Sequence, residues 1–177
     1  MALTPRGRAL RWLSTHRSYT EQPPGSNTDR RKDGIRAAQK RLGDWLVGQP
    51  WCGVWLAAAL RAGGVQGVTA RLASVAFIED DARAGRAPFR GWVTPSQRGW
   101  HKRALRGDAV VLFGYGVHVE VLRSCAWHYR RLGLIRTEGG NTSSGNAGSQ
   151  DNGGGSYVRL RRIRDVRGIA LVDFPNH

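Results

Sequence analysis

The first half of the chain repeats its hydrophobic residues every three or four positions, the spacing that places side chains on one face of a helix. Leu10 and Leu13 follow this spacing near the N-terminus, and Ile35 and Ala38 follow it further along, with Trp45 on the same side. The pattern predicts four helices, at about residues 6–18, 29–47, 51–60 and 70–84. The third is apolar on every side, so we expect it to be buried.

The second half changes to the two-residue alternation that is typical of strands. Within residues 117–122 this alternation places His118, Glu120 and Leu122 on one face. Strands are expected at about residues 108–113, 117–122, 129–137, 156–164 and 168–174, with a loop rich in Gly, Asn and Ser at 139–155. Helices followed by an antiparallel run of strands indicate the α+β class. We find no internal repeat and no linker, which predicts a single domain over residues 1–177.

The charge of the chain is strongly unbalanced, with 28 Lys and Arg residues against 13 Asp and Glu residues, a formal net charge of +15. Only Lys32, Lys40 and Lys102 are lysines, which leaves 25 arginines. Such a surface attracts polyanions, for example an anionic cell wall, anionic lipid or nucleic acid. The arginines are scattered along the chain and form no basic arm or recognition helix, so nucleic acid is the less favoured partner.

Several other classes of protein are disfavoured by the composition. Two cysteines cannot build a disulfide framework or a four-ligand zinc site, and the five histidines show no metal-binding spacing, so we expect no metal and no cofactor. Residues 1–18 are too polar and arginine-rich for a signal peptide. No run approaches the roughly 18 apolar residues of a membrane span.

Cys52 is the first candidate for chemistry. Pro50 favours the start of a helix, which places Cys52 in the first turn. Free backbone N–H groups and the helix dipole favour a thiolate there, and the same N–H groups, including that of Cys52, would receive an oxyanion. The alternative is a small buried hydrophobic residue. Cys125 follows a strand, has no helix to activate it, and is interpreted as structural.

His118 is the second candidate, because it interrupts a strand of apolar, β-branched residues. A cysteine on a helix and a histidine on a strand are what a cysteine hydrolase needs: the imidazole takes the thiol proton and later protonates the leaving amine. A lone strand histidine is otherwise a satisfied polar group. A third group must orient the ring; Asn141 and Glu138 are candidates, and Glu120 is either a further partner or a solvated charge.

These residues resemble the CHAP family, the cysteine, histidine-dependent amidohydrolases/peptidases, in the versions found in phage lysins and tail-associated lysins. The resemblance spans roughly residues 6–165 and rests on the motifs at 21–27, 48–52, 107–108, 118–119, 140–143 and 152–154. It implies a papain-like fold and hydrolysis of peptidoglycan stem peptides or cross-bridges by an N-acetylmuramoyl-L-alanine amidase or endopeptidase.

The resemblance also implies roles for particular residues. Cys52 would be the nucleophile, His118 the general base and Asn141 the residue that orients the imidazole. Many members place a catalytic glutamate two residues before the asparagine, where this chain has Gly139; Glu138 lies one position further back, which favours a Cys-His-Asn triad without the acid.

The surroundings of these residues suggest further roles. Gln49 is either an oxyanion donor or part of a simple loop. Trp51 and Gly140 are expected to contact substrate, although the tryptophans of this segment also suit a core or a groove lining.

A phage-encoded peptidoglycan hydrolase is therefore the leading hypothesis. It would act from the host cytoplasm on the cell wall, or as part of a virion in contact with tail proteins. The alternatives are a basic binding module for cell wall or nucleic acid that has lost catalysis, and an enzyme that uses the same residues for acyl transfer.

Overall fold

The computed structural model describes residues 2–114, 116–142 and 154–175, which combine six α-helices with a six-stranded sheet. The helices are α1 (Pro5–Thr15), α2 (Ile35–Leu42), α3 (Cys52–Ala62), α4 (Val75–Arg83), α5 (Trp100–Arg103) and α6 (Trp127–Arg131). Short 3-10 turns lie at η1 (Asp44–Leu46), η2 (Ala70–Ala73) and η3 (Ile163–Asp165). None of these helices is long and apolar enough to cross a membrane.

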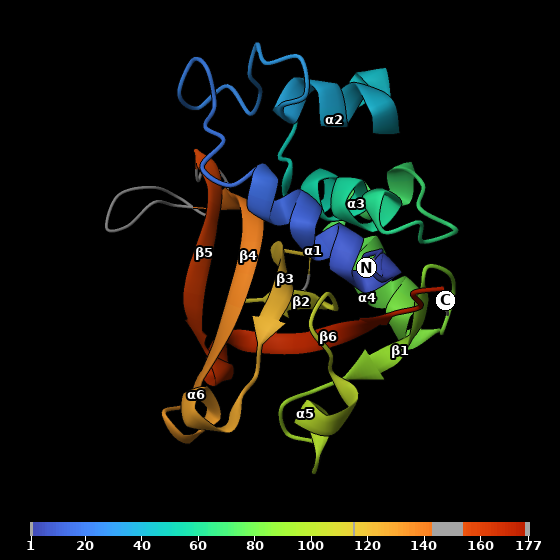
Figure 1. Ribbon diagram of the computed structural model, residues 1–177, viewed down its shortest axis with the longest axis vertical. Coiled ribbons are helices and arrows are strands. Elements are labelled where there is room, and N and C mark those ends of the chain that lie inside the picture. The colour runs from blue at the N-terminus through green and yellow to red at the C-terminus, as the bar shows by residue number, and fades with distance from the viewer. Residues whose placement is uncertain (1, 115, 143–153, 176–177) are drawn as a thin grey trace.

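The sheet has the strand order β1-β6-β2-β3-β4-β5, and every neighbouring pair is antiparallel. Its strands are β1 (Phe89–Val93), β2 (Ala109–Leu112), β3 (His118–Ser124), β4 (Leu134–Thr142), β5 (Gly155–Arg162) and β6 (Val166–Val172). The sheet twists strongly: β4 and β5 stand upright in Figure 1, whereas β6 and β1 run across the view. The expected mixture of helices and an antiparallel sheet is thus confirmed.

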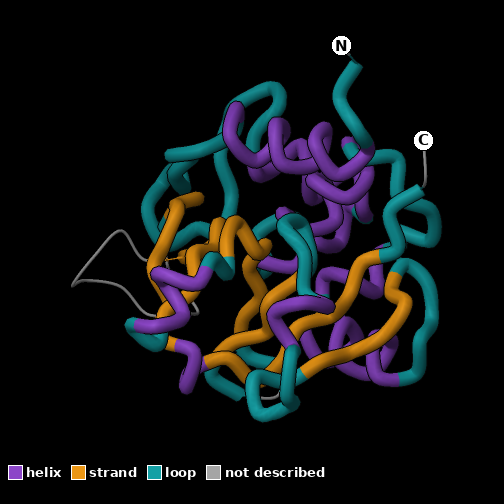
Figure 2. The backbone as a smooth tube through the Cα atoms, turned by 60° about the horizontal axis from the view of Figure 1, so that its bottom comes forward, coloured by secondary structure: helices purple, strands orange, loops and turns teal. Residues whose placement is uncertain are grey.

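Helix α3 lies at the centre of the larger hydrophobic cluster. Its Trp55 and Leu60 are at most 1 % exposed, and the cluster extends to Val119 and Val121 of β3. Alternate residues of the strands, such as Leu122, join a second cluster around Trp100. Helices lie above the strands and also beside and below them in Figure 2, and α3 contacts β3 and β4 of the sheet. The prediction of a buried third helix is therefore confirmed.

The second predicted helix, over residues 29–47, is wrong at both ends. Helix α2 covers only Ile35–Leu42, because the backbone leaves the helical region at Gly43, where φ is 168° and ψ is 131°. A single 3-10 turn, η1, follows. Trp45 therefore loses the helical position that predicted its burial, and 68 % of its surface is exposed.

The sheet also differs from the prediction at three places. The segment expected to be a loop around Pro88 contains β1, which pairs with β6. Residues expected to begin a strand at 129 belong to helix α6, and β4 continues to Thr142. Most of the loop predicted at 139–155, including Ser143 and Asn152, lies outside the described residues.

Candidate active site

Cys52 is the first residue of α3, as the sequence predicts. The residue before it, Trp51, makes no side-chain hydrogen bond to the helix, so the first N–H groups of α3 keep no protein cap. A side chain at position 53 would place its Cβ 2.1 Å from the carbonyl oxygen of Leu72, so Gly53 allows η2 to pack against this end of α3. Cys52 itself is 7 % exposed.

His118 begins β3 and pairs with Leu112, the last residue of β2. Its side chain is buried, and its Nε2 atom lies 3.2 Å from Oε1 of Glu120. Its Nδ1 atom is buried and makes no hydrogen bond of normal geometry in the described structure. Nδ1 is therefore the ring nitrogen left for the thiol.

The thiol and the imidazole favour each other's charged form. Burial acts to raise the pKa of Cys52, but the interaction with His118 and the backbone N–H groups of Val119 and Gly53 lower it overall. Burial acts to lower the pKa of His118, whereas Cys52 and Glu120 raise it to about 9. The electrostatics of the pair therefore shift it toward a thiolate and an imidazolium.

Glu120 is the group that holds the imidazole of His118. It is 1 % exposed, and Arg161 donates to it from β5, as does the hydroxyl of Thr137 from β4. Burial acts to raise its pKa, but the bonds with His118 and Arg161 keep the pKa well below the usual range of a glutamate. Glu120 is therefore a buried carboxylate whose charge is matched by an arginine and an imidazolium.

The space for Glu120 comes from a glycine on the neighbouring strand. The register of β3 and β4 places Gly139 opposite Glu120, and a Cβ at position 139 would lie 2.6 Å from Cγ of Glu120. The position at which the CHAP resemblance expects a glutamate is therefore occupied by a glycine, and the side chain of Glu120 fills the space beside it.

The two residues that the sequence offered as third members lie on β4. Asn141 is buried near the end of that strand with a φ of 54°, and the contact of Nε2 of His118 at 3.2 Å is with Glu120. Glu138 accepts from Arg17 at 2.9 Å and pairs with Arg123 at 3.3 Å. Glu120 is therefore the carboxylate that contacts His118, Glu138 pairs with arginines, and the role of Asn141 in orienting the imidazole stays a prediction. The alternation that aligns Glu120 with His118 was the sequence signal for this contact.

Trp51 and Gly140 pack against each other inside the protein, and their expected contact with substrate stays a prediction. Trp51 is fully buried, and its Nε1 donates to Glu21 at 2.9 Å. A Cβ at Gly140 would lie 2.2 Å from the ring of Trp51 and 2.7 Å from that of Trp55. This close approach lets β4 pack against the beginning of α3.

Gln49 is exposed and lines a hollow of about 220 Å³. Pro50, two residues before Cys52 in the sequence, also lines it. The backbone carbonyl of Gln49 accepts from Gln39 at 2.9 Å. The exposed Trp45 forms another wall of the hollow, and Ala73 and Ser74 complete the side next to η2. The role of Gln49 as an oxyanion donor stays a prediction.

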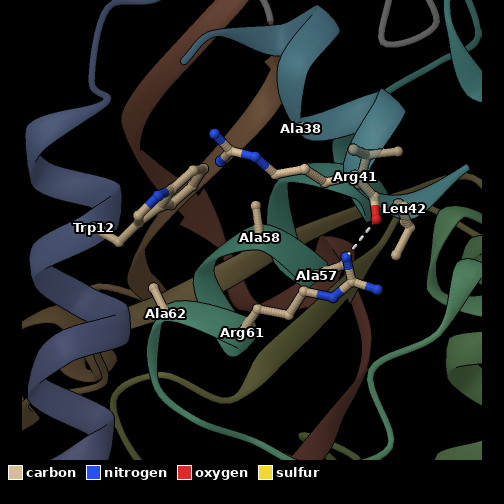
Figure 3. Close-up of a pocket in the computed structure, with 9 residues that line it drawn as sticks. Trp12, Ala38, Arg41, Leu42, Ala57, Ala58, Arg61 and Ala62 are labelled. Carbon is tan, nitrogen blue, oxygen red and sulfur yellow. Dashed lines mark hydrogen bonds between the residues drawn. The ribbon is translucent and has the colours of Figure 1, made fainter. Parts of the chain in front are cut away.

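A second hollow, of about 290 Å³, lies between α1, α2 and α3 (Figure 3). Its walls are the indole of Trp12, the guanidinium groups of Arg41 and Arg61, and small or aliphatic side chains. Arg61 donates to the carbonyl oxygen of Arg41 at 2.7 Å. These lining residues include no nucleophile or general base, so this hollow is a weaker candidate for chemistry than the surroundings of Cys52.

In the described part of the chain, no group of three or more His, Cys, Asp or Glu side chains is arranged to hold a metal ion. Comparison of the chain with protein-family models, curated proteins and solved structures finds no match. The residues around Cys52 and the resemblance in their motifs are therefore the basis on which a function can be inferred.

Proposed function

We propose that this chain is a cysteine hydrolase that cleaves an amide bond of peptidoglycan through an acyl-enzyme. The observation that carries the proposal is the arrangement of Cys52 at a helix N-terminus, beside a buried His118 whose other ring nitrogen is held by Glu120. A residue with only a packing role needs neither a lowered thiol pKa nor an oriented imidazole.

The proposed reaction begins with attack of the Cys52 thiolate on the carbonyl carbon of the amide. The uncapped N–H groups at the start of α3, including that of Cys52, stabilise the oxyanion of the tetrahedral intermediate. His118 donates its proton to the nitrogen as the C–N bond breaks, which releases the amine and leaves a thioester on Cys52. His118 then takes a proton from water as the oxygen attacks the thioester, and the carboxylic acid leaves, which restores the thiolate of Cys52 and the imidazolium of His118.

Glu120 positions His118 throughout this cycle. A carboxylate on Nε2 holds the ring with Nδ1 toward the nucleophile and stabilises the imidazolium form. Arg161 and Thr137 keep the carboxylate ionised and fixed. This assigns to Glu120 the part that the CHAP resemblance gives to Asn141.

Peptidoglycan as substrate comes from the resemblance to the CHAP family, which also supports a papain-like arrangement of α3 against the sheet. The bond would be the N-acetylmuramoyl-L-alanine amide or a bond within the stem peptide or cross-bridge. The hollow lined by Gln49 and Pro50, three and two residues before Cys52 in the chain, is the proposed place for substrate. A phage origin, with action at the cell wall as a lysin or as part of a virion, is part of the same proposal.

A second candidate function is a basic binding module that no longer catalyses a reaction. The net charge of +15 favours it, because such a charge alone retains a protein on an anionic envelope. The two candidates differ in whether Cys52 is needed for release of wall fragments.

The deciding experiment incubates wild type, Cys52→Ala and Cys125→Ala with purified cell walls of several chemotypes, followed by mass spectrometry of the soluble products. Cys125 is the matched control, because it is the only other cysteine and burial raises the pKa of its thiol. We expect new amine termini from wild type and Cys125→Ala but not from Cys52→Ala. Binding of all three proteins without fragments from any wall would favour the binding module.

A further inference from the structure

A groove lined by arginines lies at the other end of β3 from His118. Its volume is about 520 Å³, and it runs between α1 and the segments that flank β2 and β3. The lining residues are Thr4, Arg6, Gly7, Leu10, Arg11, Ser14, Arg106 and Arg123. Arg123 is five residues beyond His118, so about 17 Å of strand separates the groove from the catalytic histidine.

The carboxylates near this groove do not balance its arginines. Arg6 is paired with the buried Asp108 at 3.2 Å, and Arg123 with the buried Glu138 at 3.3 Å. Arg11 and Arg106 are exposed, and their side chains form no ion pair in the described part of the chain. The groove therefore carries excess positive charge on the exposed Arg11 and Arg106. These lie beside two arginines whose charge is already paired with a buried carboxylate.

The fixed arginines are held in place from within the protein. Arg123 donates to the carbonyl oxygen of Leu10 at 3.0 Å and to the hydroxyl of Ser14 at 3.2 Å. The guanidinium group of Arg6 lies 4.3 Å from the centre of the Phe174 ring. Burial lowers the pKa of Arg123, Glu138 acts to raise it, and the nearby Arg106, Arg17 and Arg136 act to lower it further. Repulsion of this kind is relieved when an anion binds.

We propose that this groove binds the phosphodiester backbone of an anionic cell-wall polymer, a chain of polyol phosphates, and so holds the enzyme on its substrate. Guanidinium groups recognise phosphate in a bidentate manner, and several along one groove suit an anion with regularly spaced charges. The lining residues include no aromatic ring on which a nucleobase could stack, which disfavours single-stranded nucleic acid. The choice of a wall polymer over other polyanions rests on the proposed function.

The test compares two double variants of equal charge. Arg11→Ala/Arg106→Ala removes the two outward arginines of the groove, and Arg30→Ala/Arg36→Ala removes two exposed arginines near the start of α2. Binding of each protein to a fluorescent poly(glycerol phosphate) of defined length is measured by anisotropy over a range of salt concentrations. Single-stranded and double-stranded DNA of equal charge are measured in parallel, as are vesicles of anionic lipid.

We expect the groove variant to bind poly(glycerol phosphate) at least about tenfold more weakly than wild type. The slope of its logarithmic binding constant against logarithmic salt concentration should correspond to about two fewer phosphate contacts. The control variant should retain most of the affinity. Equal losses in both variants, or tighter binding of DNA or lipid than of the polymer, would overturn the proposal.

Catalysis is followed separately. The groove variant should still cleave a small soluble wall fragment, since its substitutions are far from Cys52. If the groove variant loses polymer binding but retains cleavage, the proposed role of the groove in binding is supported. If the wild-type protein binds the polymer but cleaves no cell wall, only the assignment as a hydrolase is contradicted. Circular dichroism verifies that both variants fold.

Discussion

At the scale of single residues, the site depends on the charge states of a few buried groups. Cys52 has a lowered pKa because of His118 and two backbone N–H groups, whereas burial raises the pKa of Cys125. The thiolate of Cys52 therefore forms at a lower pH than that of Cys125, and only a thiolate attacks alkylating reagents at a useful rate.

We predict that iodoacetamide at about pH 6 alkylates Cys52 at least about tenfold faster than Cys125. Peptide mass spectrometry after short incubations measures both rates in the same molecule. His118→Ala should remove most of the difference, because the largest influence that lowers the pKa of Cys52 is the imidazole. Equal rates in wild type would contradict the assignment of Cys52 as nucleophile.

A second prediction concerns the residue that orients His118. Glu120→Gln keeps the shape of the side chain but removes the charge on Nε2, so turnover should fall by about 10²- to 10⁴-fold. Because Glu120 helps to raise the pKa of His118 to about 9, the alkaline limb of the pH–rate profile should move to lower pH. Kinetics over pH 5–10 measure both effects.

Asn141→Ala is the comparison for this variant, since Asn141 is equally buried, and the CHAP resemblance gives it the orienting role that the contact with His118 assigns to Glu120. We expect it to lower turnover less and to leave the pH profile unshifted. The reverse ranking would return Asn141 to the role given by the CHAP resemblance. Circular dichroism of both variants separates these effects from unfolding.

The sequence was sufficient to propose Cys52 and His118, because a helix start after a proline and a polar residue within a β-branched strand are local signals. It was insufficient for the third group. The bond to Glu120 depends on the missing side chain at Gly139, and on Arg161 and Thr137 arriving from other strands. Such a network depends on strand register, which periodicity alone does not fix.

At the scale of elements, the site depends on how closely β4 approaches α3. Gly140 is the point of contact, and a methyl group there would overlap the rings of Trp51 and Trp55. Movement of either tryptophan would disturb the start of α3, where Cys52 lies. The packing of one glycine therefore connects the stability of the sheet to the geometry of the nucleophile.

We predict that Gly140→Ala lowers the free energy of unfolding by about 1–3 kcal/mol through overpacking, and lowers turnover as well. Gly114→Ala is a suitable control, because its Cβ would meet only Val117 at 3.4 Å, an ordinary contact. Denaturant titrations of both variants measure the difference. A Gly140→Ala protein as stable as Gly114→Ala would show that the two elements pack less tightly than described.

Prediction of elements from the sequence succeeded where the pattern was local and failed where it was not. Helix α3 and strand β3 have continuous patterns and appear where expected. Strand β1 has a glycine at its centre and only five residues, so its strand character depends on distant pairing with β6. Helix α2 ends early because Gly43 adopts an extended backbone, which the hydrophobic spacing up to Trp45 concealed.

At the scale of the whole molecule, a net charge of +15 means that arginines outnumber carboxylates, so one carboxylate can form ion pairs with several arginines. Glu79 of α4 shows this: it is 1 % exposed, accepts from Arg83 at 2.8 Å, and accepts from Arg167 of β6 at 2.7 Å. Burial acts to raise its pKa, but the two arginines lower it overall. Its ionised form therefore joins a helix to the sheet.

This arrangement predicts a loss of stability in acid. A carboxylate whose pKa is lower in the folded state contributes stability above its unfolded pKa, and that contribution is lost as the pH falls through the folded pKa. The free energy of unfolding should therefore decrease as the pH drops below about 5, and protonation also increases the self-repulsion of a cationic chain.

Glu79→Gln should lower the free energy of unfolding by about 1–3 kcal/mol at pH 7 and weaken this pH dependence. Asp165→Asn is the control, because its pair with Arg164 is exposed and 4.0 Å long, so its effect should stay below about 0.5 kcal/mol. Denaturant titrations from pH 3 to pH 7 measure all three proteins, and a Glu79→Gln curve parallel to wild type would show that another group governs acid unfolding.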